Sequence, residues 1–341
     1  MNKKQKLTIL FFLIIFSLYS YISWINSIVI LSLSIFFYSV ILYFLISPFK
    51  KIKNKEYKIF NFINYKLFLD VFLYKVSILI LSLIIIIWWF SYYQNEVAPA
   101  SMPIYYLTNW DKKIVFQSMS HIWSENFYND VVKNITNFKK NWYVLYYEWV
   151  KPWSEESHEK FDKALWIKLD QKTYENMSKL YGLVNQDNTQ FLGLINNLDY
   201  NIDISIDEIV KYYDDLKIKN NNQNRIYKEP LNASEIIINK LASLRENELK
   251  VLIYINKSFM NLIIKSDWLK NTIQKEFTNK DLFDIILNKR NEVIADKIIL
   301  WEDKNIIITY GLLHFNWVFE LLKQNDIKWK IEKIDYLYPI K

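Results

Sequence analysis

Two of the three histidines in this chain occupy matching places in the sequence. His121 closes the stretch KKIVFQSMSH and His314 closes KNIIITYGLLH, and in both cases an amphipathic stretch and a second apolar run follow. A neutral imidazole binds divalent transition metals and can also transfer a proton near neutral pH. Gly311, one of only three glycines, precedes His314 by three residues. We expect Gly311 to let the backbone turn tightly off a strand, so that His314 lies just beyond the strand end.

A carboxylate and a guanidinium also stand where a charge is informative. Glu148 ends the apolar run NWYVLYYE, where a carboxylate is costly unless it is paired or coordinates a metal. The alternative role of Glu148 is an ion pair with a nearby lysine. Arg290 lies in NKRNEVIADKI, a helical pattern in which we expect, from the residues alone, an exposed charge. His158, in the charged stretch SEESHEKF, is expected to be a solvated helix residue.

These side chains can meet only if a sheet brings several strand ends together. Each of the two histidine segments has the order apolar strand, three-residue step, His, amphipathic helix and strand, which predicts two β-xxxH-α-β units. Such units form a mixed or parallel sheet flanked by helices, and ligands bind at the carboxyl ends of the strands. We therefore predict an α/β domain over residues 96–341. A hairpin is expected around Thr108–Asp111, a helix start at Ser124 and a capping box at Ser205–Glu208.

The first 95 residues predict a membrane anchor. No charged residue occurs over the 41 positions from Leu7 to Ser47, which is about twice the length that one crossing of a bilayer needs. A third uncharged run ends in Trp and Tyr residues, as expected for an interfacial belt. We predict three transmembrane helices, at about 7–21, 28–46 and 76–93, with Pro48 helping to end the second. A signal peptide has a shorter apolar core, and a core helix is rarely uncharged on every face.

The lysines predict the orientation of this anchor. Three lysines precede the first apolar run and six lie between the second and the third, whereas the short segment between the first two has none. The positive-inside rule then places the N-terminus in the cytoplasm and the C-terminal domain outside it, in a multi-pass protein of the cell membrane.

Charge and composition exclude several classes of function. Residues 1–93 carry a net charge of +8, so the remaining chain has a net charge of −1 and offers no basic face for nucleic acid. The absence of cysteine excludes disulfides and thiolate metal sites. HExxH, GxSxG and Walker motifs are also absent from the sequence. We expect neither a nucleotide nor an organic cofactor.

The order of these motifs resembles that of the TraB/PrgY/GumN family, which includes the Tiki membrane-anchored metalloproteases. The resemblance covers about residues 102–336. It is carried by SMSH ending at His121, Glu148 in LYYEWVKP, the pair Arg290 and Asn291, GLLH ending at His314, and a middle segment that contains Asp203. The chain departs from the family where Ser118 stands in place of a glycine, and in its three N-terminal helices.

The resemblance implies a metal-dependent peptidase or hydrolase. It implies that His121 and His314 bind Mn²⁺, Co²⁺ or Zn²⁺, and that Glu148 completes the metal shell or acts as general base. Arg290 would hold a substrate carboxylate or a developing oxyanion. Asn291 and Asp203 would contact substrate, and Gly311 and Ser118 would shape the two turns.

Three other functions stay open at this point. Related folds include metal-independent, esterase-like enzymes in which His and Glu act directly as general base. A degenerate first motif also suits a non-catalytic protein that binds a peptide or sequesters a pheromone. The third alternative is a structural membrane protein whose outer domain serves assembly.

Overall fold

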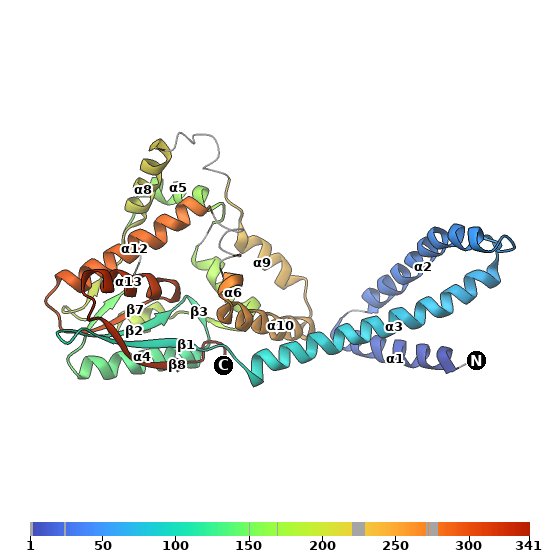
Figure 1. The fold of residues 1–341 in the computed structure, drawn as a ribbon, viewed down its shortest axis with the longest axis horizontal. Helices are drawn as coiled ribbons and strands as arrows, with labels where there is room; N and C mark the ends of the chain where they lie inside the picture. Colours follow the sequence, from blue (N-terminus) through green and yellow to red (C-terminus); the bar gives the residue numbers. More distant parts are fainter. Residues whose placement is uncertain are drawn as a thin grey trace. The chain divides into compact units, whose positions relative to one another are not determined.

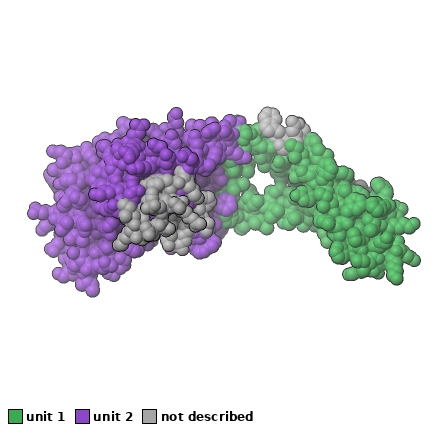
Figure 2. Space-filling view, turned by 90° about the horizontal axis from the view of Figure 1, so that it is seen from above, with its two compact units in different colours: residues 1–92, 243–255 green, residues 93–242, 256–341 purple. Residues whose placement is uncertain are grey.

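The computed structural model describes residues 3–23, 25–149, 151–168, 170–219, 229–270, 272 and 279–341. The chain forms two compact units, which Figure 2 distinguishes by colour. The first unit contains residues 1–92 and 243–255, and the second contains residues 93–242 and 256–341. Each unit is described by itself below.

The first unit contains three helices that are long and apolar enough to span a membrane, which supports a transmembrane protein. They are α1 (Lys3–Ile22), α2 (Ile25–Lys53) and α3 (Phe62–Tyr92). Their burial is the reverse of that in a water-soluble bundle. Ser39 and Ser77 are fully buried, whereas Phe37 and Ile85 are about 60% exposed. Small residues at helix contacts and large apolar residues facing outward are typical of packing in lipid.

All three helices extend beyond the predicted spans, α2 and α3 by the largest number of residues. Pro48 was predicted to help end the second helix, but it lies inside α2, which continues to Lys53. A proline removes only one backbone donor, and the three lysines of the last turn interact favourably with the helix dipole. The third helix begins at Phe62, well before Lys75. The charged Asp70 on its first turns accepts a hydrogen bond of 2.8 Å from Gln5 Nε2.

A segment from far along the chain belongs to this first unit. Helix α10 (Glu246–Lys265) begins just after Arg245, which donates a hydrogen bond to the carbonyl of Ser23. The hydroxyl of Ser23 in turn donates to Glu248, and Asn247 Nδ2 donates to the carbonyl of Tyr21 at 2.9 Å. These bonds satisfy carbonyl groups at the end of α1 that have no partner within the helix.

The second unit is built on a mixed six-stranded sheet, as the sequence predicts for the fold class. The strand order is β6-β4-β7-β2-β1-β8. Strands β2, β7, β4 and β6 are parallel neighbours, and β1 is antiparallel to both β2 and β8. A separate antiparallel pair joins β3 to β5. The strands are β1 (Met102–Thr108), β2 (Lys113–Met119), β3 (Ile122–Trp123), β4 (Val144–Tyr147), β5 (Val184–Asn185), β6 (Tyr200–Asn201), β7 (Asn305–Gly311) and β8 (Lys330–Leu337).

Helices cover both faces of this sheet (Figure 1). Helix α4 (Glu125–Lys140) packs on the face that carries Val115, Leu145 and Ile307. Helices α12 (Lys280–Leu300) and α13 (Phe315–Asn325) pack on the opposite face. Because β2 and β7 are buried on both faces, their central residues, IVF in β2 and III in β7, are apolar without alternation.

The local predictions for this unit are confirmed where the described residues test them. Strands β1 and β2 form a hairpin around Thr108–Asp111. Ser124 caps α4 by accepting a hydrogen bond from the backbone of Phe127. Ser205 and Glu208 exchange the two bonds of a capping box, of 2.8 and 3.2 Å. The remaining helices are α5 (Glu155–Leu165), α6 (Gln171–Tyr181), α7 (Asn188–Leu192), α8 (Ile206–Lys219) and α9 (Ala233–Ala242).

The segment that leads from α3 into β1 is fastened to α10. It forms one turn of π-helix, Tyr93–Val97, and then runs extended to Met102. Asn261 of α10, which is fully buried, accepts a hydrogen bond from the backbone of Ala100 at 2.7 Å. Asn261 Nδ2 donates to Asn95 Oδ1 at 3.0 Å, and Lys265 donates to the carbonyl of Ala98. This entry segment (residues 93–101) is therefore a fixed part of the second unit.

We expect Asn261→Ala to lower the free energy of unfolding by about 1–3 kcal/mol, because it leaves the Ala100 amide and the Asn95 carboxamide buried without this partner. The measurement is denaturant unfolding of the full chain in detergent. Asn316→Ala is the matched control, because Asn316 is an exposed helix residue. Equal effects of the two substitutions would contradict the structural role of Asn261.

Candidate functional site

Three parallel strands bring polar side chains to one edge of the sheet. Glu148 directly follows β4, Asp203 lies two residues after β6, and Tyr310 is the penultimate residue of β7. These strands are neighbours in the order β6-β4-β7, so their carboxyl ends meet. Helix α12 adds Arg290 and Asn291 from the face that it covers.

Arg290 is the centre of a buried ion-pair network. Its Nε and Nη2 donate to the two oxygens of Asp203 at 2.7 and 2.6 Å, which is a bidentate pair. Nη2 also donates to Glu148 Oε1 at 2.6 Å, and Nε donates to the Tyr310 hydroxyl at 2.9 Å. The side chain of Arg290 is 13% exposed and that of Asp203 is 2% exposed. The expectation of an exposed charge at Arg290 is therefore wrong, and Glu148 pairs with this arginine.

The electrostatics of this network keep Arg290 charged. Burial by itself lowers the pKa of Arg290, but the charge of Glu148, together with Tyr310 and Asp203, raises that pKa well above its usual value. Burial raises the pKa of Tyr310, because it disfavours the charged phenolate. The hydroxyl of Tyr310 donates to Asp203 Oδ1 at 2.9 Å. One guanidinium thus faces two carboxylates, and the network carries a net charge of about −1.

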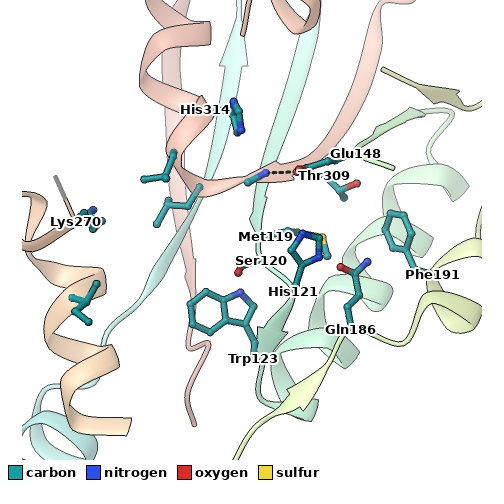
Figure 3. Close-up of a pocket in the computed structure, with 14 residues that line it drawn as sticks. Met119, Ser120, His121, Trp123, Glu148, Gln186, Phe191, Lys270, Thr309 and His314 are labelled. Atoms are coloured by element: carbon teal, nitrogen blue, oxygen red, sulfur yellow. Dashed lines mark hydrogen bonds between the residues drawn. The ribbon is translucent and has the colours of Figure 1, made fainter. Parts of the chain in front are cut away.

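The second oxygen of Glu148 is held by the backbone. Oε2 accepts a hydrogen bond of 2.8 Å from the amide of Gly311, which Figure 3 draws as a dashed line. The amide of Glu148 donates to the carbonyl of Thr309 at 3.1 Å, which continues the pairing of β4 with β7. Both carboxylate oxygens are therefore oriented before any ligand binds.

Gly311 has a different role from the predicted one. Its φ of −54° is accessible to any residue, so the turn does not require glycine. A Cβ at this position would instead lie 3.2 Å from His314 Cδ2, 3.7 Å from His314 Nε2 and 3.7 Å from Glu148 Oε2. Glycine keeps open a small space that the carboxylate and the imidazole border together.

His314 is a buried, neutral imidazole of fixed orientation. It lies in a short 3-10 turn, Leu312–His314, and is 4% exposed. Its Nδ1 is 2.7 Å from Asn291 Oδ1, and because a carboxamide oxygen can only accept, Nδ1 carries the hydrogen and Nε2 the lone pair. Burial and then the charge of Arg290 lower the pKa of His314 to about 3. At physiological pH this ring is therefore an acceptor or a metal ligand, and it is not a cation.

His121 lies in a different environment. It is exposed in the step between β2 and β3, and its ring centroid is 5.1 Å from that of Tyr174. In Figure 3 His121 and His314 lie apart, with the bond between Gly311 and Glu148 between them. Ser118 is fully buried within β2 and pairs with Tyr310, so Met119 rather than Ser118 is the register partner of Gly311. The two histidine steps are therefore offset by one residue across the sheet.

These residues border a cleft of about 350 Å³ at the strand ends. Most of its walls are apolar, with Met119, Trp123, Phe191, Ile263, Leu312 and Leu313. Its polar groups are Ser120, His121, Glu148, Gln186, Lys270, Thr309 and His314.

Thr309 is a polar residue of the cleft that was not predicted from the sequence, although a signal was present. Thr309 is 2% exposed, and among the described residues its hydroxyl has no hydrogen-bond partner. A buried hydroxyl without a partner at a cleft is a place where a ligand atom can bind. The signal was a polar residue inside the run IIITYG, but a threonine in a strand is common enough to pass as a structural residue.

The three predicted metal ligands do not lie together: Glu148 and His314 border one small space, and His121 does not. Glu148 and His314 have suitable chemistry, and Asn291 orients His314 in the way that outer-shell partners orient metal ligands. His121, the third predicted ligand, lies elsewhere on the cleft wall. Among the residues that the structure describes, no group of three or more His, Asp or Glu is arranged to hold an ion.

Removal of Arg290 is expected to leave two buried carboxylates without their cation. We expect Arg290→Met to lower the free energy of unfolding by about 3–5 kcal/mol. Lys289→Met is the matched control, because Lys289 is partly exposed and contacts the exposed Glu292 and the ring of Tyr212, so its loss should cost about 1 kcal/mol or less. The measurement is denaturant unfolding in detergent, and similar costs for both variants would contradict the network.

His314 is expected to stay neutral down to about pH 4 in the folded protein. Its folded pKa of about 3 lies below the unfolded value of 6.5, so only the unfolded state takes up a proton between these pH values. This histidine therefore destabilises the fold by about 1.4 kcal/mol per pH unit as the pH falls below 6.5. NMR of labelled histidine measures the titration, and only three histidines have to be assigned. A His314 resonance that titrates near pH 6.5 would exclude this burial.

No protein-family model, curated protein or solved structure matches this chain. The resemblance to the TraB/PrgY/GumN family therefore depends on the motifs in the sequence alone.

Proposed function

We propose that this chain is a membrane-anchored hydrolase that acts on peptides, with its reaction centred on Glu148 and His314. One observation carries the proposal. A buried imidazole that stays neutral, and whose Nε2 lone pair is fixed by Asn291, borders the same small space as an oriented carboxylate oxygen. A structural core would gain more stability from apolar residues at these positions than from a buried charge network.

The residues of the cleft would have different roles in peptide hydrolysis. Asn291 orients His314, and Arg290 and the Gly311 amide orient Glu148. Glu148 would either accept the proton of the attacking water or complete the shell of a metal ion. Arg290 already donates to two protein carboxylates, so we assign it a positioning role in place of the substrate contact that the resemblance implies. The same holds for Asp203 and Asn291, whose oxygens are engaged within the protein.

A divalent ion remains part of the proposal. Glu148 and His314 would hold Mn²⁺, Co²⁺ or Zn²⁺, with His121 as a third ligand if its exposed step moves inward. The ion would polarise the peptide carbonyl and make its bound water more acidic. The net charge of about −1 on the network and the neutral His314 both suit a cation in this space.

The cleft itself indicates the kind of substrate. Its apolar walls suit a hydrophobic side chain next to the bond that is broken. The unpartnered Thr309 hydroxyl is placed to hydrogen-bond a peptide group of the substrate. Lys270 is 21% exposed at the rim and could bind a substrate carboxylate in exchange for its pair with Asp267.

We also infer the finer features of fold and orientation. The segments β2–His121–α4–β4 and β7–His314–α13–β8 would be equivalent units, each placing a histidine after a strand. The lysine distribution supports a cytoplasmic N-terminus and an extracytoplasmic second unit.

A non-catalytic peptide-binding protein is the second candidate. It is favoured by the position of His121, away from Glu148 and His314, and by the occupation of both Glu148 oxygens within the protein. Such a protein would use the same apolar cleft to hold a peptide and would leave it intact.

The proposal is tested with the full chain in nanodiscs and a peptide library analysed by mass spectrometry. We expect cleavage that Glu148→Gln and His314→Ala each reduce by at least about 100-fold, because each removes a reacting group. His158→Ala is the matched control, because His158 stacks on Trp153 outside the cleft. A chelator followed by Mn²⁺, Co²⁺ or Zn²⁺ tests the role of the ion.

Three results distinguish the candidates. Cleavage that is lost with the chelator and restored by an ion supports the metal-dependent enzyme. Cleavage that survives the chelator but not the two substitutions supports direct acid–base catalysis. Stoichiometric peptide binding without cleavage by the folded wild-type protein supports the binding protein and overturns the enzyme.

A further inference from the structure

The cleft and the entry of the chain lie at the same edge of the sheet. Strand β1 is antiparallel to β2, and Ile104 pairs with Gln117, so the start of β1 lies beside the end of β2. The carboxyl ends of β2, β7 and β4 border the cleft. The chain therefore enters the second unit from α3 at the edge that carries the cleft, and the turns around Trp110 and Trp142 lie at the opposite edge.

The entry segment and the cleft wall are held by one helix. Within the second unit, Asn261 and Lys265 of α10 bond the backbone of residues 98–100. Ile263, which lies between them in sequence, lines the cleft. Within the second unit, the entry segment and this wall of the cleft are therefore fixed to each other.

A second hollow lies beside the cleft, near the entry segment. It has a volume of about 550 Å³ and is bordered by Ser101 and Pro103 at the start of β1. It shares Leu312, Leu313 and Lys270 with the first cleft. A peptide that occupies both hollows runs from Glu148 toward the residues that follow the third apolar helix.

The length of the connection limits how far this edge can lie from a bilayer. Four residues lie between Val97 and Met102, and an extended chain spans at most about 3.5 Å for each of the five Cα–Cα steps, which gives about 17 Å. Helix α3 ends in Trp88, Trp89 and Tyr92, residue types that are enriched at the membrane–water interface. The start of β1, at the edge with the cleft, is thus joined to the end of the apolar helix by a short connection.

We propose that the cleft takes peptide segments that lie at the membrane surface, such as the juxtamembrane part of a lipid-anchored or membrane-spanning protein. This inference rests on the proposed function for its chemistry, but its geometry depends only on connectivity and strand direction. Anchoring enzyme and substrate in one bilayer raises the effective concentration of the substrate segment. A long spacer lowers that concentration and carries the segment away from the surface.

The orientation is tested first, without any reaction. The chain has no cysteine, so single labels can be placed at Ser120→Cys in the cleft and at Trp142→Cys, which is 87% exposed at the opposite edge. Fluorescence energy transfer to acceptor lipid headgroups in nanodiscs reports the distance of each label from the bilayer. Strand β2 has seven residues, or about 23 Å, so we expect clearly higher transfer from position 120. Equal or higher transfer from position 142 overturns the inference whether or not the protein is an enzyme.

Substrate preference is tested with one cleavable sequence in three forms, using the full chain in liposomes. The forms are a free peptide, a palmitoylated peptide with a spacer of about 5 residues, and a palmitoylated peptide with a Gly/Ser spacer of about 40 residues. Because effective concentration falls as about the −3/2 power of spacer length, we expect cleavage of the short-spacer form to be about 10–20 times faster than that of the long-spacer form.

The two experiments separate the two proposals. Faster cleavage of the long-spacer or free form contradicts the surface substrate while leaving the hydrolase intact. If no form is cleaved, the hydrolase fails. Crosslinking of the same three peptides to the cleft then decides the surface preference by itself, and equal capture of all three overturns it.

Discussion

The second unit depends on one buried guanidinium and the groups that accept its hydrogens. Arg290 reaches from α12 to Asp203 after β6, to Glu148 after β4 and to Tyr310 at the end of β7. Desolvation makes such a network a poor source of stability by itself, but each member becomes costly if its partner is displaced. The network therefore fixes the positions of three strand ends and of α12 more strictly than apolar packing would. A functional site needs side chains in such fixed positions, whereas a hydrophobic core does not.

A small space lies beside this network, between Glu148 and His314. Gly311 contributes no side chain between Glu148 and His314, and the hydroxyl of Thr309 lacks a partner among the described residues. His314 adds no charge, because burial and the neighbouring guanidinium keep its ring neutral. The result is a small polar space with an excess of acceptors, at the base of a cleft with mostly apolar walls. A cation, or a group with hydrogens to donate, is the complementary ligand.

The two units differ in the kind of side chain that they bury. In the first unit large apolar side chains face outward and serines lie in the helix contacts, as expected for a lipid environment. In the second unit β2 and β7 are buried by helices on both faces. Helix α10 contributes residues to both units, and the bonds of Asn247 and Glu248 to the end of α1 are local to the first.

The sequence by itself determined the elements and the places where chemistry could occur. Apolar runs predicted the three long helices, strand and helix patterns predicted a mixed sheet flanked by helices, and Ser124 and the Ser205–Glu208 pair predicted helix starts. All of these are properties of short windows, in which periodicity and capping act between near neighbours. The positions of Glu148 and His314 at strand ends followed from the same local patterns.

Only the tertiary structure decided which of these residues meet. Arg290 and Asp203 are 87 positions apart, and Gly311 and Glu148 are 163 apart, so nothing in a local window pairs them. The matching motifs suggested that His121 would be a partner of His314. The step into β3 instead leaves His121 on the cleft wall. The reason for Gly311 also changed, from backbone conformation to the space that its missing Cβ leaves. Contacts of this kind arise from packing, because strand order and helix placement bring distant residues to one edge.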